Sequence, residues 1–271
     1  MRKYFWLLCL MAASATAHAQ KEIVFGIFPY VSPSELVRYH APLRQYLSRA
    51  LDRPVTLVTA PDFKALIERT QRGEYDIVLT APHLGRLAQI RDGYQPVVRT
   101  RHEVQGLFLA RKDAGIAKLE DIKGKRIMMA EPLAIIFHMA EGLLNEHGVF
   151  LGKNATLIET KAHNNAMYAP LRDEADVGVT GFRLWEGLPP EEKDKLVVVA
   201  ATRKVPGFFV LAHQRMPAAE VERLRRALLE FEHSPEGPAD YAVKSLKGFS
   251  KIEAKDLAVL DPYVKFLLER P

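Results

Sequence analysis

The chain has 271 residues, of which 48% are hydrophobic and 26% are charged, and its formal net charge is +5. This ordinary soluble composition is long enough for a large core and for two lobes. The net charge is too small, and the basic residues are too scattered, for a nucleic-acid-binding protein.

The N-terminus differs from the rest of the chain. A basic start is followed by a short apolar segment at residues 4–15 and by a small-x-small cleavage site at residues 17–19. We therefore predict that residues 1–19 are a secretory signal peptide that is cleaved after Ala19. The apolar segment is too short to span a membrane, and Cys9 lacks the small residues that precede a lipidated cysteine.

Cleavage at this site would remove the only cysteine of the chain, Cys9, together with Arg2 and Lys3. The mature chain would then have a net charge of +3 and could form neither a disulfide nor a reactive thiol. An exported, cysteine-free chain is typical of the periplasm of a Gram-negative bacterium.

Strands and helices alternate over the first hundred residues of the predicted mature chain. Short apolar runs predict strands, and apolar residues at helical spacing predict helices between them. The predicted strands are residues 22–28, 55–59, 75–80 and 95–100. The predicted helices are residues 36–51, with Pro42 as a kink or a late start, residues 63–70 after a cap at Asp62, and a third that opens at Pro82. This order predicts a mostly parallel sheet with helices on both faces.

A second βα series follows a change of rhythm at residues 101–111. The predicted strands are residues 105–110, 126–130, 156–160, 175–180, 197–201 and 208–212. The predicted helical segments are residues 119–124, a helix that opens at Pro132 and stops at Gly148, one that opens at His163, residues 181–185, and three in the C-terminal tail after Pro217, Ser234-Pro235 and Asp261-Pro262.

These two series predict an α/β protein with two lobes, each a mostly parallel sheet flanked by helices. The crossings would lie near residues 101–106 and 201–207. Lobe 1 would comprise residues 20–103 and 204–271, and lobe 2, inserted in it, residues 104–203. Ligands bind beyond the carboxyl ends of strands in open α/β sheets, so these ends would face a cleft between the lobes.

The stretch from Ala130 to His138 is the first place to look for a ligand. It leads from a predicted strand into a helix whose first turn suits Pro132. Such a junction points free backbone N–H groups at one spot and favours an anion there. The alternative is a buried βα unit without a ligand.

The candidate ligand-binding residues come from the predicted strand ends, the helix starts and the nearby aromatic residues. They are Tyr30, Phe63, Thr80, Glu131, Leu133, Ala134, Ile135, His163, Asn164, Thr180 and Phe208.

Several of these candidates have a second interpretation. His163 and Asn164 can donate hydrogen bonds to a ligand or can form a capping cluster. Glu131 can accept from a ligand amine or can simply suit a helix N-terminus. Phe63 and Phe208, with Phe182 and Trp185, can wall an apolar ligand or pack within the lobes, and packing is expected for Trp185. His83 and His138 are weaker candidates.

Nothing in the sequence predicts a cofactor, a metal site or catalysis. The histidines show no paired spacing, there is no phosphate-cradling glycine loop, and no nucleophile motif is present.

An ordered set of short motifs resembles the phosphate/phosphite/phosphonate substrate-binding proteins of ABC importers. The motifs are Pro61-Asp62-Phe63, Tyr75-Asp76-Ile77-Val78, residues 119–126, Glu131-Pro132, His163-Asn164-Asn165-Ala166 and Glu174-Ala175-Asp176-Val177. The resemblance runs from about Glu22 to the C-terminus. It implies a type II periplasmic-binding-protein fold, a monomeric clamp that closes on a small molecule, and an inner-membrane permease or sensor kinase as partner.

The chain departs from this family at the ligand grip. In the family, Ser and Thr residues follow the acid-Pro pair and hold the phosphoryl oxygens, whereas residues 133–136 here carry no hydroxyl group. Thr80 stands where a tyrosine is expected, and Phe208 where an acidic residue is expected, while His163 matches. Without these partners a phosphonate binds less well, although the backbone N–H groups of residues 133–135 remain for an anion.

Three functions are compatible with the sequence. The first is a substrate-binding protein of an ABC importer for a small anionic or organic ligand. The second is a ligand-sensing subunit partnered with a membrane sensor kinase. The third is an enzyme on the same architecture that resembles chorismate dehydratases, which the predicted signal peptide disfavours because those enzymes are cytoplasmic.

Overall fold

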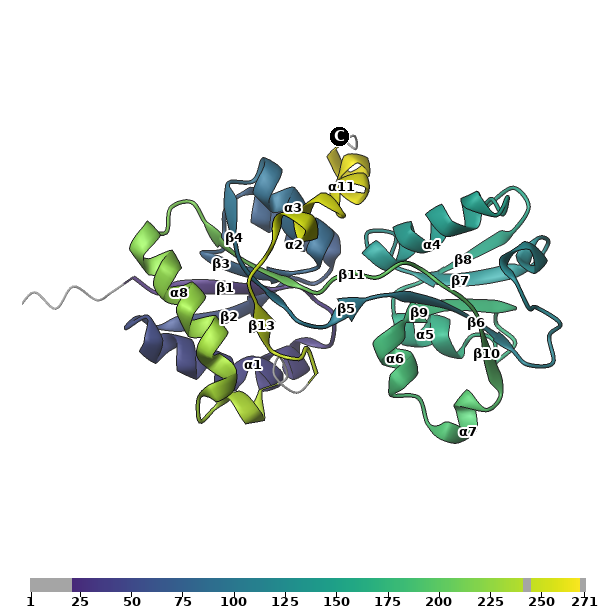
Figure 1. Cartoon of the computed structure of the whole chain (residues 1–271), viewed down its shortest axis with the longest axis horizontal. Coiled ribbons are helices and arrows are strands. Elements are labelled where there is room, and N and C mark those ends of the chain that lie inside the picture. The colour runs from purple at the N-terminus through teal and green to yellow at the C-terminus, as the bar shows by residue number, and fades with distance from the viewer. Residues whose placement is uncertain (1–20, 241–244, 269–271) are drawn as a thin grey trace, which may run out of the picture.

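The computed structural model describes residues 21–240 and 245–268, and these form two α/β lobes joined by a narrow ribbon (Figure 1). The predicted signal peptide, residues 1–19, lies outside the described residues. Within the described ranges, no helix has both the length and the apolar character needed to cross a membrane.

The first lobe is built on a six-stranded sheet in the order β13-β4-β12-β3-β1-β2. Its strands are β1 (Ile23–Ile27), β2 (Val55–Thr59), β3 (Ile77–Thr80), β4 (Tyr94–Thr100), β12 (Phe209–His213) and β13 (Phe249–Ser250). Its helices are α1 (Pro33–Ala50), α2 (Phe63–Gln71), α3 (Pro82–Arg91), α8 (Ala218–Glu230), α10 (Ala254–Ala258) and α11 (Asp261–Leu268). Short 3₁₀ turns lie at Phe231–His233 and Gly237–Ala239.

The second lobe is built on a five-stranded sheet in the order β10-β6-β9-β7-β8. Its strands are β6 (Gly106–Arg111), β7 (Arg126–Ala130), β8 (Thr156–Thr160), β9 (Val177–Gly181) and β10 (Leu196–Ala201). Its helices are α4 (Ile135–Glu146), α5 (His163–Tyr168), α6 (Phe182–Glu186) and α7 (Pro190–Lys193), with a 3₁₀ turn at Leu119–Ile122.

The ribbon between the lobes consists of β5 (Glu103–Val104) and β11 (Val205–Pro206), which pair antiparallel. The chain leaves the first sheet through β5 and returns to it through β11, as Figure 1 shows. Both segments lie at the crossings expected from the sequence. The finer division at residues 103/104 and 203/204 stays a prediction.

The mixed strand directions correct the expectation of mostly parallel sheets. In the first sheet, β1 pairs parallel with β2 and β3, but β12 lies between β3 and β4 and is antiparallel to both. The reason is that β12 returns from the other lobe and enters the sheet from the opposite end. In the second sheet, β6 is likewise antiparallel to β9 and β10.

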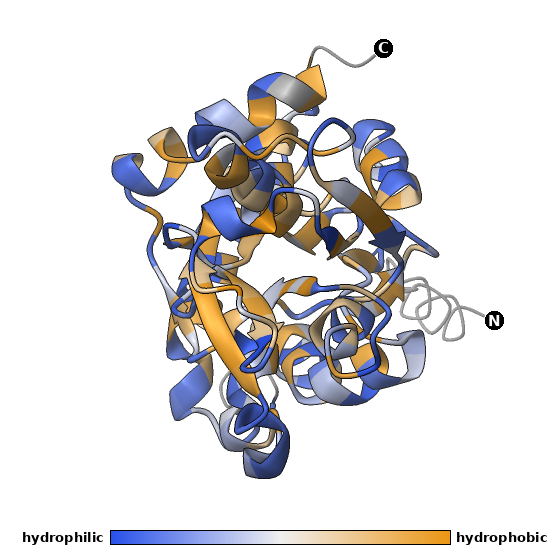
Figure 2. Cartoon of the chain, turned by 90° about the vertical axis from the view of Figure 1, so that its right-hand side faces the viewer, coloured by the Kyte–Doolittle hydropathy of each residue, from blue (hydrophilic) through white to orange (hydrophobic). Residues whose placement is uncertain are grey.

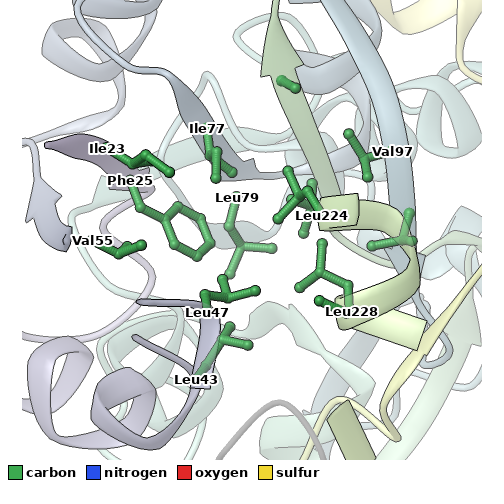
Figure 3. Close-up of a cluster of buried hydrophobic side chains, with 14 of the residues drawn as sticks. Ile23, Phe25, Leu43, Leu47, Val55, Ile77, Leu79, Val97, Leu224 and Leu228 are labelled. Carbon is green, nitrogen blue, oxygen red and sulfur yellow. The ribbon is translucent and has the colours of Figure 1, made fainter. Parts of the chain in front are cut away.

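The main core of the first lobe lies between its sheet and the helices α1 and α8 (Figure 3). Apolar residues of both helices meet the alternating inward residues of the strands. Full burial of each such side chain contributes about 1.5–3 kcal/mol. Figure 2 shows the hydrophobic segments concentrated in the strands and the hydrophilic ones on the outer helices and loops.

Local signals explain where the long helices begin. Ser32 and Glu35 form a capping box before α1, so this helix begins at Pro33 and continues through Pro42 rather than starting late. Asp62 caps α2 as predicted, because its carboxylate accepts from the N–H of Ala65 at 2.7 Å.

Two local expectations need correction, and two short elements were missed. Helix α4 begins at Ile135 and not at Pro132, since the left-handed Glu131 (φ 42°) is followed by a turn in which Ala134 N–H donates to its carbonyl. The segment after Ser234-Pro235 forms a 3₁₀ turn at Gly237–Ala239, and residues 241–244 lie outside the described residues. Strand β13 and helix α10 were not predicted, because each is too short to show a periodicity.

Candidate functional site

A cleft of about 550 Å³ lies between the lobes, beside the β5–β11 ribbon. Its lining comes from the segment after β1 and the start of α2 in the first lobe, and from the starts of α4, α5 and α6 in the second. The volume is that of a site for a small molecule. The carboxyl ends of strands in both sheets therefore meet at one cavity, as expected for open α/β sheets.

The first lobe contributes a wall of four aromatic rings, which we call the aromatic wall: Phe28, Tyr30, Phe63 and Phe208. The ring of Phe28 contacts the other three, with centroid distances of 4.9 Å to Tyr30, 5.9 Å to Phe63 and 4.7 Å to Phe208. The last two contacts are edge-to-face, the geometry that aromatic pairs prefer. These contacts restrict the rotation of the four rings, so the aromatic wall has a fixed shape.

A buried polar chain holds the Tyr30 ring in this wall. Its hydroxyl oxygen lies 2.7 Å from Nε2 of His40, and Nδ1 of His40 lies 3.9 Å from a carboxylate oxygen of Asp240. The side chains of His40 and Asp240 are fully buried. Burial lowers the pKa of His40 to about 4, so the ring is neutral at neutral pH. A neutral imidazole facing a carboxylate favours hydrogen on Nδ1, and Tyr30 O–H then donates to Nε2.

The start of α4 forms the facing wall of the second lobe. Ala134, Ile135 and Ile136 line the cleft, and so does Glu131. The carboxylate of Glu131 accepts from the N–H of Leu133 at 3.2 Å, and its carbonyl accepts from the N–H of Ala134 at 2.8 Å. Two of the three backbone N–H groups predicted to hold an anion are therefore already bound by Glu131 itself.

The start of α5 carries His163 and Asn164, and both line the cleft. Burial lowers the pKa of His163 to about 4, so this ring is neutral. Its Nδ1 is buried and has no hydrogen-bond partner within the described residues. The hydroxyl of Thr180 donates to the carbonyl of His163 at 3.2 Å and anchors the first residue of the helix.

Eight of the eleven predicted residues line the cleft, and Thr80, Leu133 and Thr180 do not. Thr80 and Thr180 are buried in β3 and β9, because side chains alternate across a strand and theirs face the helix layers. The carbonyl of Leu133 instead binds Nε2 of His83 at 2.9 Å, across the lobes. His83 thus has a role at the lobe contact rather than in the cleft.

The cleft also contains residues that were not predicted to bind a ligand. Phe28, the centre of the aromatic wall, ends the first predicted strand, and its position before Pro29 was the available signal. Lys161 follows β8 directly and Arg183 lies two residues after β9, where a search of strand ends for charged residues would have found them. Phe182 lines the cleft with 38% of its surface exposed. Trp185 packs in the second lobe, as expected.

The charges of the cleft do not favour a strong anion. Burial, and then the nearby charge of Arg183, lower the pKa of His102 to about 3, so neither His102 nor His163 adds positive charge. Lys161 and Arg183 line the cleft together with three carboxylates, those of Glu35, Glu103 and Glu131.

Two of these carboxylates have partners of their own. The carboxylate of Glu35 accepts from the hydroxyl of Ser32 at 2.6 Å, and the carboxylate of Glu103 forms an ion pair with Lys204 at 3.2 Å.

Across the ranges that the structure covers, His, Cys, Asp and Glu form no group suited to a metal ion.

Comparisons with known proteins agree with this arrangement. Residues 25–257 match the family described as "ABC transporter, phosphonate, periplasmic substrate-binding protein". Among similar solved structures, PhnD1 from Prochlorococcus marinus (MIT 9301), in complex with methylphosphonate, has a TM-score of 0.79 and 17% identity, with 92% of this chain and 99% of that chain covered.

Two further structures show the same likeness. XAC2383 from Xanthomonas citri, bound to ATP, has a TM-score of 0.77 and 21% identity, with 92% of this chain and 98% of that chain covered. The binding protein component of an ABC phosphonate transporter from Pseudomonas aeruginosa has a TM-score of 0.72 and 18% identity, with coverages of 92% and 97%. These likenesses confirm the predicted type II periplasmic-binding-protein fold.

Proposed function

Since the chain belongs to the family of periplasmic substrate-binding proteins of phosphonate ABC transporters, we propose that it is the solute-binding component of an ABC importer. In this proposal it clamps a small organic molecule between its lobes and delivers it to an inner-membrane permease. The observation that carries the proposal is the cleft of about 550 Å³, which is lined from both lobes beside a two-stranded ribbon.

The clamp works through differential binding. A ligand that contacts both lobes binds the closed arrangement more tightly than the open one, and so it shifts the population toward closure. Phe182 supports this view, because an apolar ring with 38% of its surface exposed in the cleft would become buried when the second lobe closes on a ligand.

Other parts of the proposal rest on the family. We propose a periplasmic location, with residues 1–19 removed as a signal peptide, and a monomeric protein. The family groups substrate-binding proteins, which supports binding over the enzymatic alternative. Genes for a permease and an ATPase beside the gene of this protein would support import. A histidine kinase gene there would instead favour the alternative of a ligand-sensing subunit.

A thermal-shift screen of residues 20–271 tests the binding function. The panel contains phosphate, phosphite, alkyl- and aminophosphonates, sulfonates, aromatic acids and thiamine precursors. A ligand present at about 100 times its dissociation constant should add about 2.7 kcal/mol of stability, which is a large shift in melting temperature. A panel without any shift would argue against the clamp for these classes of ligand.

Variants then locate the binding site. Phe63→Ala and His163→Ala should weaken binding of any ligand that the screen finds and leave the far-UV circular dichroism spectrum unchanged. Phe150→Ala is the matched control, because this ring is 41% exposed and lies outside the cleft. Equal affinity in all three variants would show that the ligand binds elsewhere.

A further inference from the structure

The carboxylate of Glu131 is the most unusual group in the cleft. Its backbone is left-handed, with φ at 42°, a conformation that residues other than glycine rarely adopt. A glycine would relieve this strain but would remove the carboxylate. Among the described residues, Glu131 takes part in no ion pair, although Lys161 and Arg183 also line the cleft. Within the part of the chain that the structure describes, no cation therefore lies close enough to form an ion pair with this carboxylate.

Glu131 also lies directly beside the place where an anion would bind, the start of α4 at Ile135. The first N–H groups of a helix attract negative charge. In the turn just before α4, the N–H of Leu133 donates to the Glu131 carboxylate, and the N–H of Ala134 donates to the Glu131 carbonyl. A phosphonate at this spot would have to displace one carboxylate oxygen and remain beside the other.

Lys161 and Arg183 are cations of the same cleft, but neither forms an ion pair with Glu131 within the described residues. His102 and His163 are neutral at neutral pH because burial lowers the pKa of each ring. Residues 134–136 present only apolar side chains at the start of α4. A carboxylate that lacks an ion pair and lies beside apolar surface is suited to a cation. Attraction to a positive charge compensates for the hydration free energy that the carboxylate loses when the cleft closes.

The facing wall adds a second feature that attracts a cation. The rings of the aromatic wall present π surfaces and ring edges at fixed positions. A positive nitrogen binds favourably over the face of such a ring, and the effect grows as water is excluded. Phe208 and Phe63 pack in the same cluster as Leu133 and Ile136 of the second lobe, so wall and carboxylate border one space.

We propose that the ligand of this cleft carries a positively charged amine nitrogen on an apolar body. The nitrogen binds at the carboxylate of Glu131, and the apolar body packs against the aromatic wall. This inference rests on the proposed function, because it assigns a ligand class to the same cleft.

Calorimetric titration of residues 20–271 with four probes of similar size tests the assignment. The probes are 2-phenylethylammonium and benzyltrimethylammonium as cations, 2-phenylethanol as the neutral compound and benzylphosphonate as the anion. We expect each cation to bind about tenfold more tightly, or better, than the other two probes.

The Glu131→Gln variant isolates the charge. Its side-chain carbonyl can still accept from the N–H of Leu133, so the start of α4 is kept. We expect the cations to bind this variant about as weakly as 2-phenylethanol, whose affinity should not change. Glu146→Gln, an exposed residue at the other end of α4, is the matched control and should bind all probes like the wild type.

The other outcomes overturn the assignment in distinguishable ways. If benzylphosphonate binds as tightly as the cations, the ligand class is wrong and the clamp stands. If the cations bind equally well to Glu131→Gln, the carboxylate does not recognise them. If no probe binds while a panel member without a positively charged nitrogen does, the assignment fails alone, and if neither set binds, the proposed function fails with it.

Discussion

Replacing His83 tests how the two lobes are held together and why acid should weaken the fold. Its ring is fully buried, and because a carbonyl only accepts, Nε2–H of His83 donates to the Leu133 carbonyl at 2.9 Å across the lobes. Burial lowers the pKa of His83 to about 3, from an ordinary value of 6.5. The ring is therefore neutral in the folded protein over a pH range in which the unfolded chain binds a proton.

The sign of the pH effect follows from this difference. A histidine with a lowered pKa in the folded state contributes its full stability above pH 6.5 and loses it as the pH falls toward 3. Between pH 7.5 and pH 5, protonation of the unfolded imidazole lowers the free energy of unfolding by about 2 kcal/mol. His40, His102 and His163 act in the same direction, because burial lowers the pKa of each.

Two substitutions separate the hydrogen bond from the titration. His83→Ala removes both and leaves the Leu133 carbonyl unpaired beside a cavity, which should cost about 2–4 kcal/mol at pH 7.5. His83→Gln removes the titration but keeps an N–H donor of similar reach, so it should cost about 1 kcal/mol. Both variants should lose about 2 kcal/mol less than the wild type when the pH is lowered from 7.5 to 5.

Urea unfolding at the two pH values measures all of these quantities. His233→Gln is the control, since its side chain is 74% exposed, and it should keep the pH dependence of the wild type. If both His83 variants also keep that dependence, His83 is not a buried neutral group. If His83→Ala and His83→Gln are equally stable at pH 7.5, the bond to Leu133 contributes nothing to the lobe contact.

Substitutions at three further positions test local features of the fold. Gly178→Ala should destabilise the protein by about 3 kcal/mol, because a Cβ atom would lie 1.8 Å from the carbonyl oxygen of Ala166; a change in melting temperature within the error of the wild type would contradict this. Asp62→Ala should lower the free energy of urea unfolding by about 1 kcal/mol through loss of the α2 cap, whereas Asp62→Asn should cost almost nothing. Tyr30→Phe should cost about 1–2 kcal/mol in the same assay, because it removes the 2.7 Å contact with the buried Nε2 of His40, and an unchanged stability would show that this contact does not anchor the ring.

The elements that the sequence predicted well are those with a strong local signal. Strands β2 and β7 and the cap of α2 were predicted at their observed positions, since apolar runs and an Asp before a helical period depend on neighbouring residues alone. The place of β12 in the first sheet was not predictable in this way. It depends on the return of the chain from the second lobe, and periodicity does not report strand order or direction.

The candidate site shows the same division between local and long-range information. Strand ends and helix starts indicated where the cleft would lie, and eight predicted residues line it. The position of a residue at a strand end does not show to which face of the sheet its side chain points. Thr80 and Thr180 were therefore included, although their side chains face the helix layers. The left-handed turn at Glu131 was likewise hidden, because a glutamate gives no sign of a positive φ.

In our proposal, Glu131 changes what a helix start binds without any change in the fold. The free N–H groups at such a start attract negative charge, whether it comes from a ligand or from the protein. Where a ligand supplies the charge, the site is an anion site. In this chain Glu131 supplies a negative charge beside the start of α4, its carboxylate accepts from the N–H of Leu133, and the charge left facing the cleft selects for a cation. This difference resides in side chains, so solved structures at 17–21% identity can share the fold and still differ in ligand class.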